Sequence, residues 1–111
     1  MIPKNLEECF VELEKILSKD DFNYIKNLSK QEVVILHPTL GRKIRNEWNL
    51  WHEGPLKEYF KLLGLHHADD ISMLIINCFW NYLHNQPLGV SEQIYKYQKY
   101  WSELNESAKQ K

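Results

Sequence analysis

Apolar residues recur at intervals of three and four in the second half of the chain, and this spacing constrains the fold more than any other feature. They are Ile71, Leu74, Ile75, Cys78, Phe79, Tyr82 and Leu83. The spacing places them on one stripe of an α-helix, which must be buried against the rest of the chain. A helix over about residues 68–84 is therefore predicted, and a cluster of histidine and aspartate side chains stands at its start.

The composition fits one helical domain. With 43% hydrophobic and 26% charged residues, the chain of 111 residues has an ordinary globular composition. A chain of this length folds around one core without disulfide or metal support. Only four glycines and four prolines occur, as is typical of helices joined by short loops. We expect an all-α fold, a compact single-domain bundle of five to seven helices over residues 1–111, with residues 106–111 frayed.

Capping residues mark the first two helices. Asn5 followed by Glu8 has the spacing of a capping box, in which the Asn side chain accepts from an early backbone N–H and the Glu side chain reaches back. This predicts a helix over about residues 6–18. Ser18 or Asp20 is expected to cap a second, shorter helix.

Proline and glycine punctuate the rest of the chain. The apolar run before Pro38 is interpreted as a helical turn that stops at the residue preceding the proline, where α geometry is disfavoured. A new helix is expected to begin at Gly54 and Pro55, since proline is tolerated in the first turn of a helix. Gly64 is expected to end that helix in a left-handed conformation. Ser91 is predicted to cap the last helix.

The cysteines and the N-terminal region indicate a compartment. Cys9 and Cys78 both fall on apolar helix faces, where a free thiol packs as a small hydrophobic group. The first twenty residues carry acidic side chains throughout and lack the apolar run of a signal peptide. No segment has the length of a transmembrane helix. We therefore expect a reduced, cytoplasmic protein that has no membrane partner.

The cluster before the long helix has three interpretations. His66, His67, Asp69 and Asp70 carry donor atoms that suit zinc or another divalent ion, and they also have the chemistry of an acid/base pair. Their nearly contiguous spacing is unlike that of known zinc sites. The favoured interpretation is structural: Asp69 or Asp70 caps the long helix, and Asp70 forms an ion pair with a partly buried Arg45.

A basic and aromatic segment precedes the cluster. Arg42, Lys43 and Arg45, together with Trp48 and Trp51, have the composition of a small nucleic-acid footprint. Three nearby glutamates and a net charge of −1 favour a solvated mixed face instead, with no nucleic-acid partner. Asn46 is assigned to the same structural helix as Arg45. The chain has no nucleophile motif and no glycine-rich phosphate loop, so we predict no catalytic, cofactor or metal site.

Two surfaces are candidates for binding a protein. The first helix is acidic, and the last helix carries more aromatic side chains than one small core can hide. Tyrosine and tryptophan at a surface are preferred anchors of protein interfaces. The candidate partner-binding residues are Glu7, Glu8, Glu12, Glu14, Tyr95 and Tyr97.

Two segments carry a resemblance to a known group of proteins. Residues 40–51 (LGRKIRNEWNLW) and residues 67–76 (HADDISMLII) resemble an uncharacterised family of small, all-helical bacterial domains. That family includes immunity proteins of contact-dependent growth inhibition systems. The resemblance implies a cytoplasmic protein that blocks a cognate nuclease toxin by covering its active site. The motif residues that carry over are Arg45, Asn46, Asp69, Asp70 and Ser72, and we take them as structural.

Three functions follow in order of preference. The first is a non-catalytic immunity protein that needs no cofactor and binds its toxin as a monomer. Acidic side chains agree with this function, since nuclease toxins generally present a cationic cleft. The alternative is a regulatory or nucleic-acid-associated helical module that uses residues 42–51. The third is a metal-dependent hydrolase built on the histidines and aspartates that precede the long helix.

Overall fold

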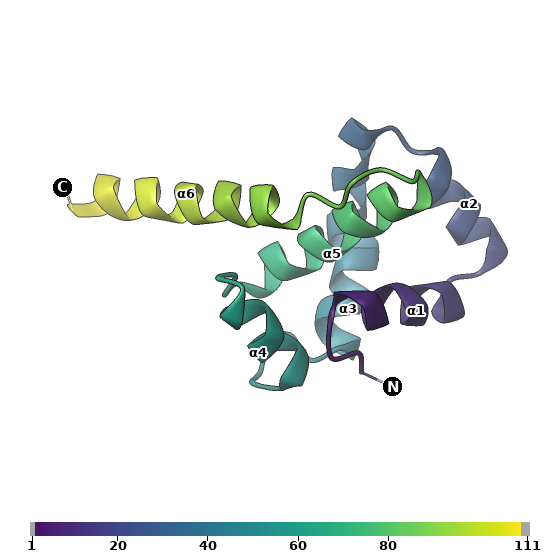
Figure 1. Cartoon of the computed structure of the whole chain (residues 1–111), viewed down its shortest axis with the longest axis horizontal. Coiled ribbons are helices and arrows are strands. Elements are labelled where there is room, and N and C mark those ends of the chain that lie inside the picture. Colours follow the sequence, from purple (N-terminus) through teal and green to yellow (C-terminus); the bar gives the residue numbers. More distant parts are fainter. Residues whose placement is uncertain (1, 110–111) are drawn as a thin grey trace.

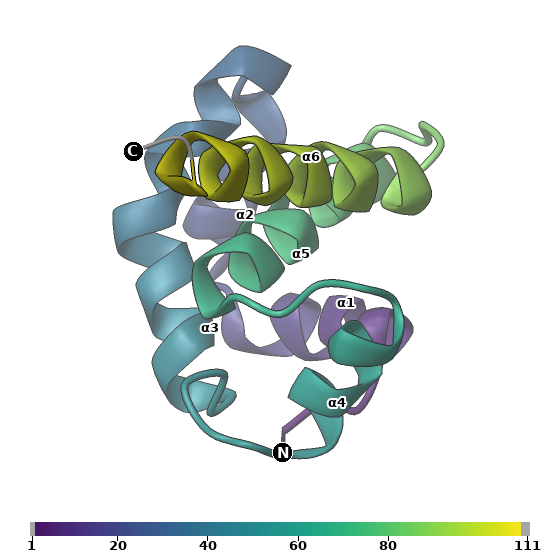
Figure 2. The ribbon, with the colours of Figure 1, turned by 90° about the vertical axis from the view of Figure 1, so that its left-hand side faces the viewer.

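Helix α5 (Ala68–Leu83) runs through the middle of the molecule, with α1 (Leu6–Ile16) on one side and α6 (Val90–Lys109) on the other (Figure 1, Figure 2). The computed structural model describes residues 2–109 of the chain. Within them it contains six α-helices, a 3-10 segment and a π segment, with no strand. The prediction of an all-α bundle is confirmed.

The apolar stripe of α5 forms the centre of the core. Five of its predicted members are completely buried, namely Ile71, Leu74, Ile75, Cys78 and Phe79. Tyr82, the sixth, is 45% exposed, although its ring stacks on Phe10 of α1 at 4.9 Å between centroids. Ile76 and Trp80 lie beside the stripe and are buried as well. Helix α5 is therefore covered on more than one side.

The first two helices begin where the capping residues place them. Asn5 accepts a hydrogen bond from the backbone N–H of Glu8 at the start of α1, and Ser18 caps α2 (Lys19–Asn27) by accepting from Asp21. The Glu8 carboxylate accepts from the backbone N–H of Lys4 at 3.1 Å, one residue before the cap that the capping box predicted. Both helix starts follow from local chemistry, because a short polar side chain satisfies an early N–H in each.

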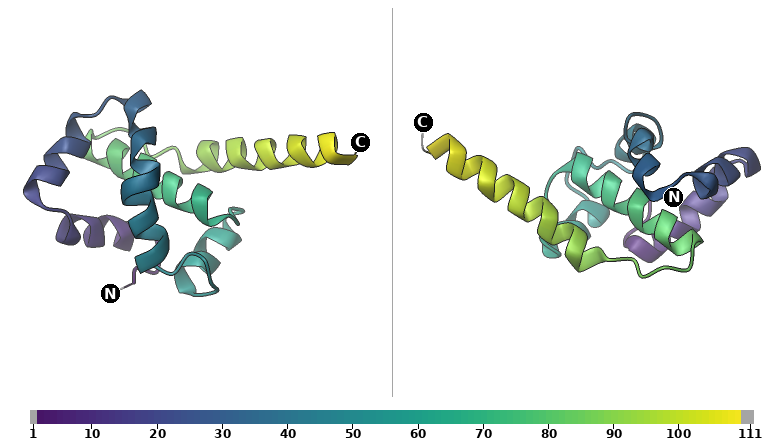
Figure 3. Two further views of the ribbon diagram at one scale, coloured as in Figure 1. Left: turned by 180° about the vertical axis from the view of Figure 1, so that it is seen from behind. Right: turned by 90° about the horizontal axis from the view of Figure 1, so that it is seen from above.

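Pro38 does not end the helical segment in which it lies, contrary to the prediction. The segment η1 (Lys30–Leu36) is a 3-10 helix, η2 (His37–Gly41) is a π segment with Pro38 in its first turn, and α3 (Arg42–Glu47) continues from it. His37, the residue before the proline, is in the right-handed helical region. The three segments form one rod that crosses α5 (Figure 3). Its apolar side chains are buried there, which offsets the local cost: Val33, Leu36, Leu40 and Ile44.

The remaining helices differ in how well their boundaries were predicted. Helix α4 (Pro55–Leu62) starts at the predicted proline, and Gly64 follows it with φ +99. Helix α6 begins at Val90, one residue before Ser91, which therefore lies inside the helix. It continues through Lys109, where fraying was expected, while residues 110 and 111 lie outside the described part. Its second half extends away from the other helices (Figure 3).

Candidate functional site

The two aspartates at the start of α5 do not cap it. His67 occupies the N-cap position with extended backbone and makes no side-chain capping bond. Asp69 and Asp70 lie in the first turn instead. Their negative charges still stabilise the positive end of the helix dipole. The capping prediction is wrong because the helix begins at Ala68, before both aspartates. Their carboxylates are therefore free to contact other side chains.

Arg45 is buried and fixes the crossing of α3 and α5. Its Nη1 donates to Ser72 Oγ at 2.9 Å, and its Nη2 donates to the carbonyl of His37 at 3.2 Å. Ser72 in turn donates to the carbonyl of Asp69 at 2.9 Å. A Cβ on Gly41 would lie 2.8 Å from Arg45 Nη1, so the glycine leaves the space that the guanidinium occupies.

The ion pair of Arg45 is with Asp69 and not with Asp70. Arg45 Nε lies 3.3 Å from Asp69 Oδ1, and the Asp69 side chain is 59% exposed. Residues 69 and 70 differ by about 100° around a helix axis, so only one of them faces α3. The predicted Arg45 to Asp70 pair is therefore wrong in its acidic partner, although the role of the pair in joining the two helices is as expected.

Asp70 faces the opposite neighbour, helix α6. Its Oδ2 accepts a hydrogen bond from the indole Nε1 of Trp101 at 2.8 Å. The imidazole of His67 stacks on the same indole with 3.9 Å between ring centroids. Sequence reasoning missed this contact, although a half-buried tryptophan generally requires an acceptor for its N–H. Asp70 and His67 thus anchor α6 to the start of α5.

Asn46 holds Trp51 in place. Its Oδ1 accepts from the Trp51 indole Nε1 at 2.9 Å. The guanidinium of Arg45 lies 6.0 Å from the centroid of the same indole, within cation–π range. Trp51 is nevertheless 53% exposed. An aromatic side chain fixed by two contacts and still open to solvent is suited to binding another molecule.

These contacts form the walls of an open cleft between α5, α6 and the loop that carries Trp51. Its volume is about 700 Å³, within the range of ligand sites. Burial raises the pKa of Tyr97 to about 12, and the nearby Asp70 carboxylate adds to the effect. The phenol of Tyr97, which is protonated at neutral pH even at its ordinary pKa, therefore stays protonated to more alkaline pH. We call this the α5–α6 cleft, and its lining comprises His37, Trp51, His67, Ala68, Asp69, Asp70, Lys96, Tyr97, Tyr100 and Trp101.

The acidic residues predicted on α1 differ in exposure. Glu12 is buried, with its Oε1 3.5 Å from Lys15 Nζ, so it is not available to a partner as predicted. Glu8 is half-buried and bonded to the backbone of Lys4. Glu7 and Glu14 are exposed. The accessible acidic surface of α1 is therefore reduced to these two side chains.

The two predicted tyrosines of α6 also separate. Tyr95 is 63% exposed, whereas Tyr97 packs against the core and lines the cleft. Two residues apart on a helix correspond to about 200°, so they face opposite sides of α6. Helix α5 lies between α1 and α6 (Figure 1, Figure 2). The acidic candidates on α1 and the aromatic candidates on α6 therefore do not form one continuous surface.

The structure also places the residues of the two other hypotheses. In the segment over residues 42–51, Arg45 and Trp48 are buried, which leaves Arg42, Lys43 and Trp51 to face a nucleic acid. Among the described residues, no three His, Cys, Asp or Glu side chains gather closely enough to hold a metal ion. The nucleic-acid footprint is thus reduced to three exposed side chains, and the four His and Asp side chains do not form such a metal-binding group. No helix of residues 2–109 combines the length and apolar character needed to cross a bilayer.

Comparison with known proteins yields one match. No curated protein and no solved structure matches the chain. A family described as a domain of unknown function, DUF6794, matches residues 2–83. The match includes α1 to α5, with Arg45, Asn46, Asp69, Asp70 and Ser72, and it ends where α5 ends, so α6 lies outside it. Because the match covers most of its length, the chain belongs to the DUF6794 family.

Proposed function

We propose that this chain is a non-catalytic binding protein, and that it acts as an immunity protein for a bacterial nuclease toxin. The observation that carries the proposal is the α5–α6 cleft, in which aromatic side chains remain accessible. Trp51 and Tyr100 are more than half exposed, and Tyr97 and Trp101 are half-buried beside them. Aromatic anchors around a concavity are the residues on which protein interfaces most depend.

The polar groups near the cleft favour binding over catalysis. Arg45 and Ser72 bond to each other, Asp69 pairs with Arg45, and Asp70 accepts from Trp101. Each group is held by the fold, and none forms the nucleophile–base pair that a hydrolytic site requires. A fixed polar frame with accessible aromatic faces is the arrangement of a preorganised binding surface.

The nuclease partner is inferred from sequence resemblance and from charge. Residues 40–51 and 67–76 resemble an uncharacterised family of small, all-helical bacterial domains, which includes immunity proteins of contact-dependent growth inhibition systems. Nuclease active sites attract a polyanion and are cationic, so an inhibitor gains association rate from carboxylates. Asp69 and Asp70 line the cleft, and the Asp69 side chain is 59% exposed. We therefore expect a basic loop of the toxin to insert between the aromatic side chains, in a complex of one toxin with one copy of this chain.

The test is protection by co-expression. An immunity gene normally lies directly downstream of its toxin, so the toxin domain encoded upstream is expressed with and without this chain in a sensitive host. We expect growth to be restored only when this chain is present. The purified proteins should form a complex of equal stoichiometry by size-exclusion chromatography with light scattering.

Two tyrosines of α6 provide a matched pair of variants. Tyr100 and Tyr95 are 58% and 63% exposed, respectively, and only Tyr100 lines the cleft. Tyr100→Ala should weaken toxin binding about thirtyfold, the effect of a typical interface hot spot, while Tyr95→Ala should change it less than about threefold. No protection by the wild-type chain would refute the immunity function. Protection that depends on Tyr95 or on Glu7 and Glu14, and not on Tyr100, would refute the cleft as the binding surface.

A further inference from the structure

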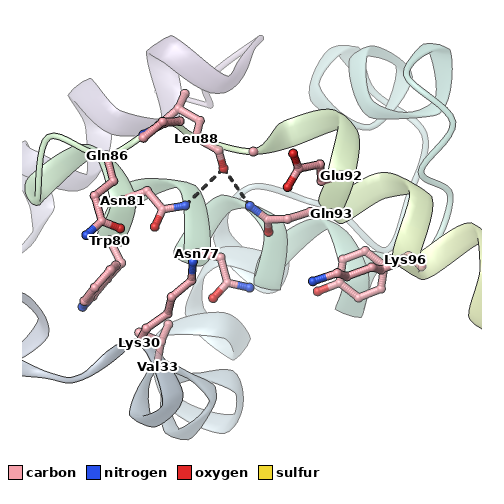
Figure 4. Close-up of a pocket in the computed structure, with 13 residues that line it drawn as sticks. Lys30, Val33, Asn77, Trp80, Asn81, Gln86, Leu88, Glu92, Gln93 and Lys96 are labelled. Carbon is pink, nitrogen blue, oxygen red and sulfur yellow. Dashed lines mark hydrogen bonds between the residues drawn. The ribbon is translucent and has the colours of Figure 1, made fainter.

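A second pocket lies on the side of α5 that faces η1 and the start of α6. Its volume is about 660 Å³. Figure 4 shows side chains from three elements around this space: Lys30 from η1, Asn77 and Asn81 from α5, and Gln93 and Lys96 from α6. The pocket is distinct from the α5–α6 cleft, with which it shares Lys96 and Tyr97.

The carboxamides in this pocket have a fixed orientation. Asn81 Nδ2 and Gln93 Nε2 both donate to the carbonyl of Leu88, at 3.1 and 2.9 Å (Figure 4). Because the nitrogens are used there, the carboxamide oxygens point away from that carbonyl. Gln93 Oε1 is buried and has no hydrogen-bond partner within the described residues. A buried acceptor without a donor is destabilising, but an oxygen that no water-sized group reaches is closed to a ligand as well.

The charged side chains of the pocket are mostly basic. Lys30 and Lys96 stand on opposite elements, and Glu92 is the carboxylate that lines the same pocket. The ion pairs found among residues 2–109 include neither lysine. The pocket therefore combines an excess of positive charge with the side-chain carboxamides of Asn77, Asn81 and Gln93.

We propose that this pocket binds a small, hydroxyl-rich anion, a sugar phosphate or a sugar acid. The anionic group lies between the ammonium groups of Lys30 and Lys96, and the hydroxyl groups donate to the oxygens of Asn81 and Asn77. Ligand sites of this kind are concave, with a few convergent polar groups that fix the orientation of the ligand. The proposal does not depend on toxin binding, since Lys30, Asn77 and Gln93 lie outside the α5–α6 cleft, although Lys96 lines both sites.

The experiment is a titration of the full-length chain, labelled with ¹⁵N, by ribose 5-phosphate and, separately, by gluconate. Saturable shifts of the side-chain amide signals of Asn77, Asn81 and Gln93 are expected with at least one of the two, and the stronger ligand identifies the anionic group. Inorganic phosphate and ribose are titrated alone and should bind more than about tenfold more weakly, because each provides only half of the contacts.

Variants separate specific binding from general attraction of anions. Lys30→Ala and Asn77→Ala should weaken binding by about tenfold and about fivefold, respectively, as expected for a charged and a neutral hydrogen bond. Lys99→Ala is the matched control, since Lys99 is on α6, pairs with Glu103 and does not line the pocket. Circular dichroism checks that each variant is folded.

Three results would overturn the proposal. The first is that neither ligand gives a saturable shift at millimolar concentration. The second is that inorganic phosphate binds as tightly as ribose 5-phosphate, which would exclude a contribution from the carboxamides. The third is that Lys99→Ala weakens binding as much as Lys30→Ala, which would indicate diffuse attraction to the surface of the protein.

Discussion

We expect Ser72→Ala to destabilise the protein more than Asp69→Asn, which removes the negative charge paired with Arg45. Ser72 is fully buried, and its Oγ accepts from Arg45 Nη1 at 2.9 Å. The substitution leaves a buried guanidinium N–H without this acceptor. A hydrogen bond to a charged group contributes about 1.5–3 kcal/mol, so we expect the free energy of unfolding to fall by about 2 kcal/mol.

Asp69→Asn should cost less, although it removes the formal ion pair. Two unit charges 3.3 Å apart attract by about 1.3 kcal/mol in water. Solvent screens the Asp69 side chain, which is 59% exposed, but the Arg45 side chain is only 7% exposed, so this value is a lower bound. Asparagine also keeps an oxygen that can accept from Arg45. The expected loss is about 1 kcal/mol, less than for Ser72→Ala, because solvent screens the carboxylate and the Arg45 guanidinium keeps its bonds to Ser72 and to the His37 carbonyl.

Urea unfolding, followed by tryptophan fluorescence and circular dichroism, measures both free energies by linear extrapolation. Asp70→Asn is the control in the adjacent position, since asparagine still offers an oxygen to Trp101 Nε1, and it should cost less than about 1 kcal/mol. If Asp69→Asn lowers the free energy of unfolding as much as Ser72→Ala, the ion pair holds α3 against α5 at least as strongly as the buried hydrogen bond. That result would refute our reasoning.

Three further predictions concern the thiols and one glycine. Cys9 and Cys78 are completely buried, and burial raises the pKa of both, so Ellman's reagent should label neither in the native protein at pH 8 and both after unfolding; rapid native labelling would contradict this. Burial raises the pKa of Cys78 from 9.0 to about 11 and that of Cys9 further, so the folded state holds both protons longer and stability should fall as pH rises from about 9 to 11. Urea unfolding measures this dependence, and Cys78→Ala should reduce its slope and leave the part due to Cys9. Gly64→Ala forces φ +99 on an L residue and brings its Cβ against Gln98 Nε2, so we expect a loss of about 1–2 kcal/mol, whereas Gly54→Ala, with open space around the Cβ, should have little effect on the thermal midpoint.

Local chemistry alone was sufficient for several elements. Asn5 and Ser18 begin their helices because a polar side chain reaches an N–H two or three residues ahead. Gly64 ends α4 because glycine adopts positive φ at low cost. The first five members of the apolar stripe of α5 are buried as the spacing predicted, since helical periodicity is a property of the sequence; Tyr82 is the exposed exception.

Contacts between elements could not be predicted in this way. The choice of Asp69 over Asp70 as the partner of Arg45 depends on the rotation of α5 against α3, and the hydrogen bond from Trp101 to Asp70 depends on the position of α6. Glu12 looked like a surface carboxylate, but the fold buries it.

The sequence by itself determined that this chain is helical, where most of its helices begin, and which face of α5 is buried, because each of these depends on residues within one or two turns of each other. The tertiary structure decided that the chain continues through Pro38, that Arg45 meets Asp69 and Ser72, and that α6 encloses the cleft. The physical reason is that burial against a distant segment outweighs a local conformational preference of about 1 kcal/mol. The local sequence pattern does not show which distant residues a segment will contact.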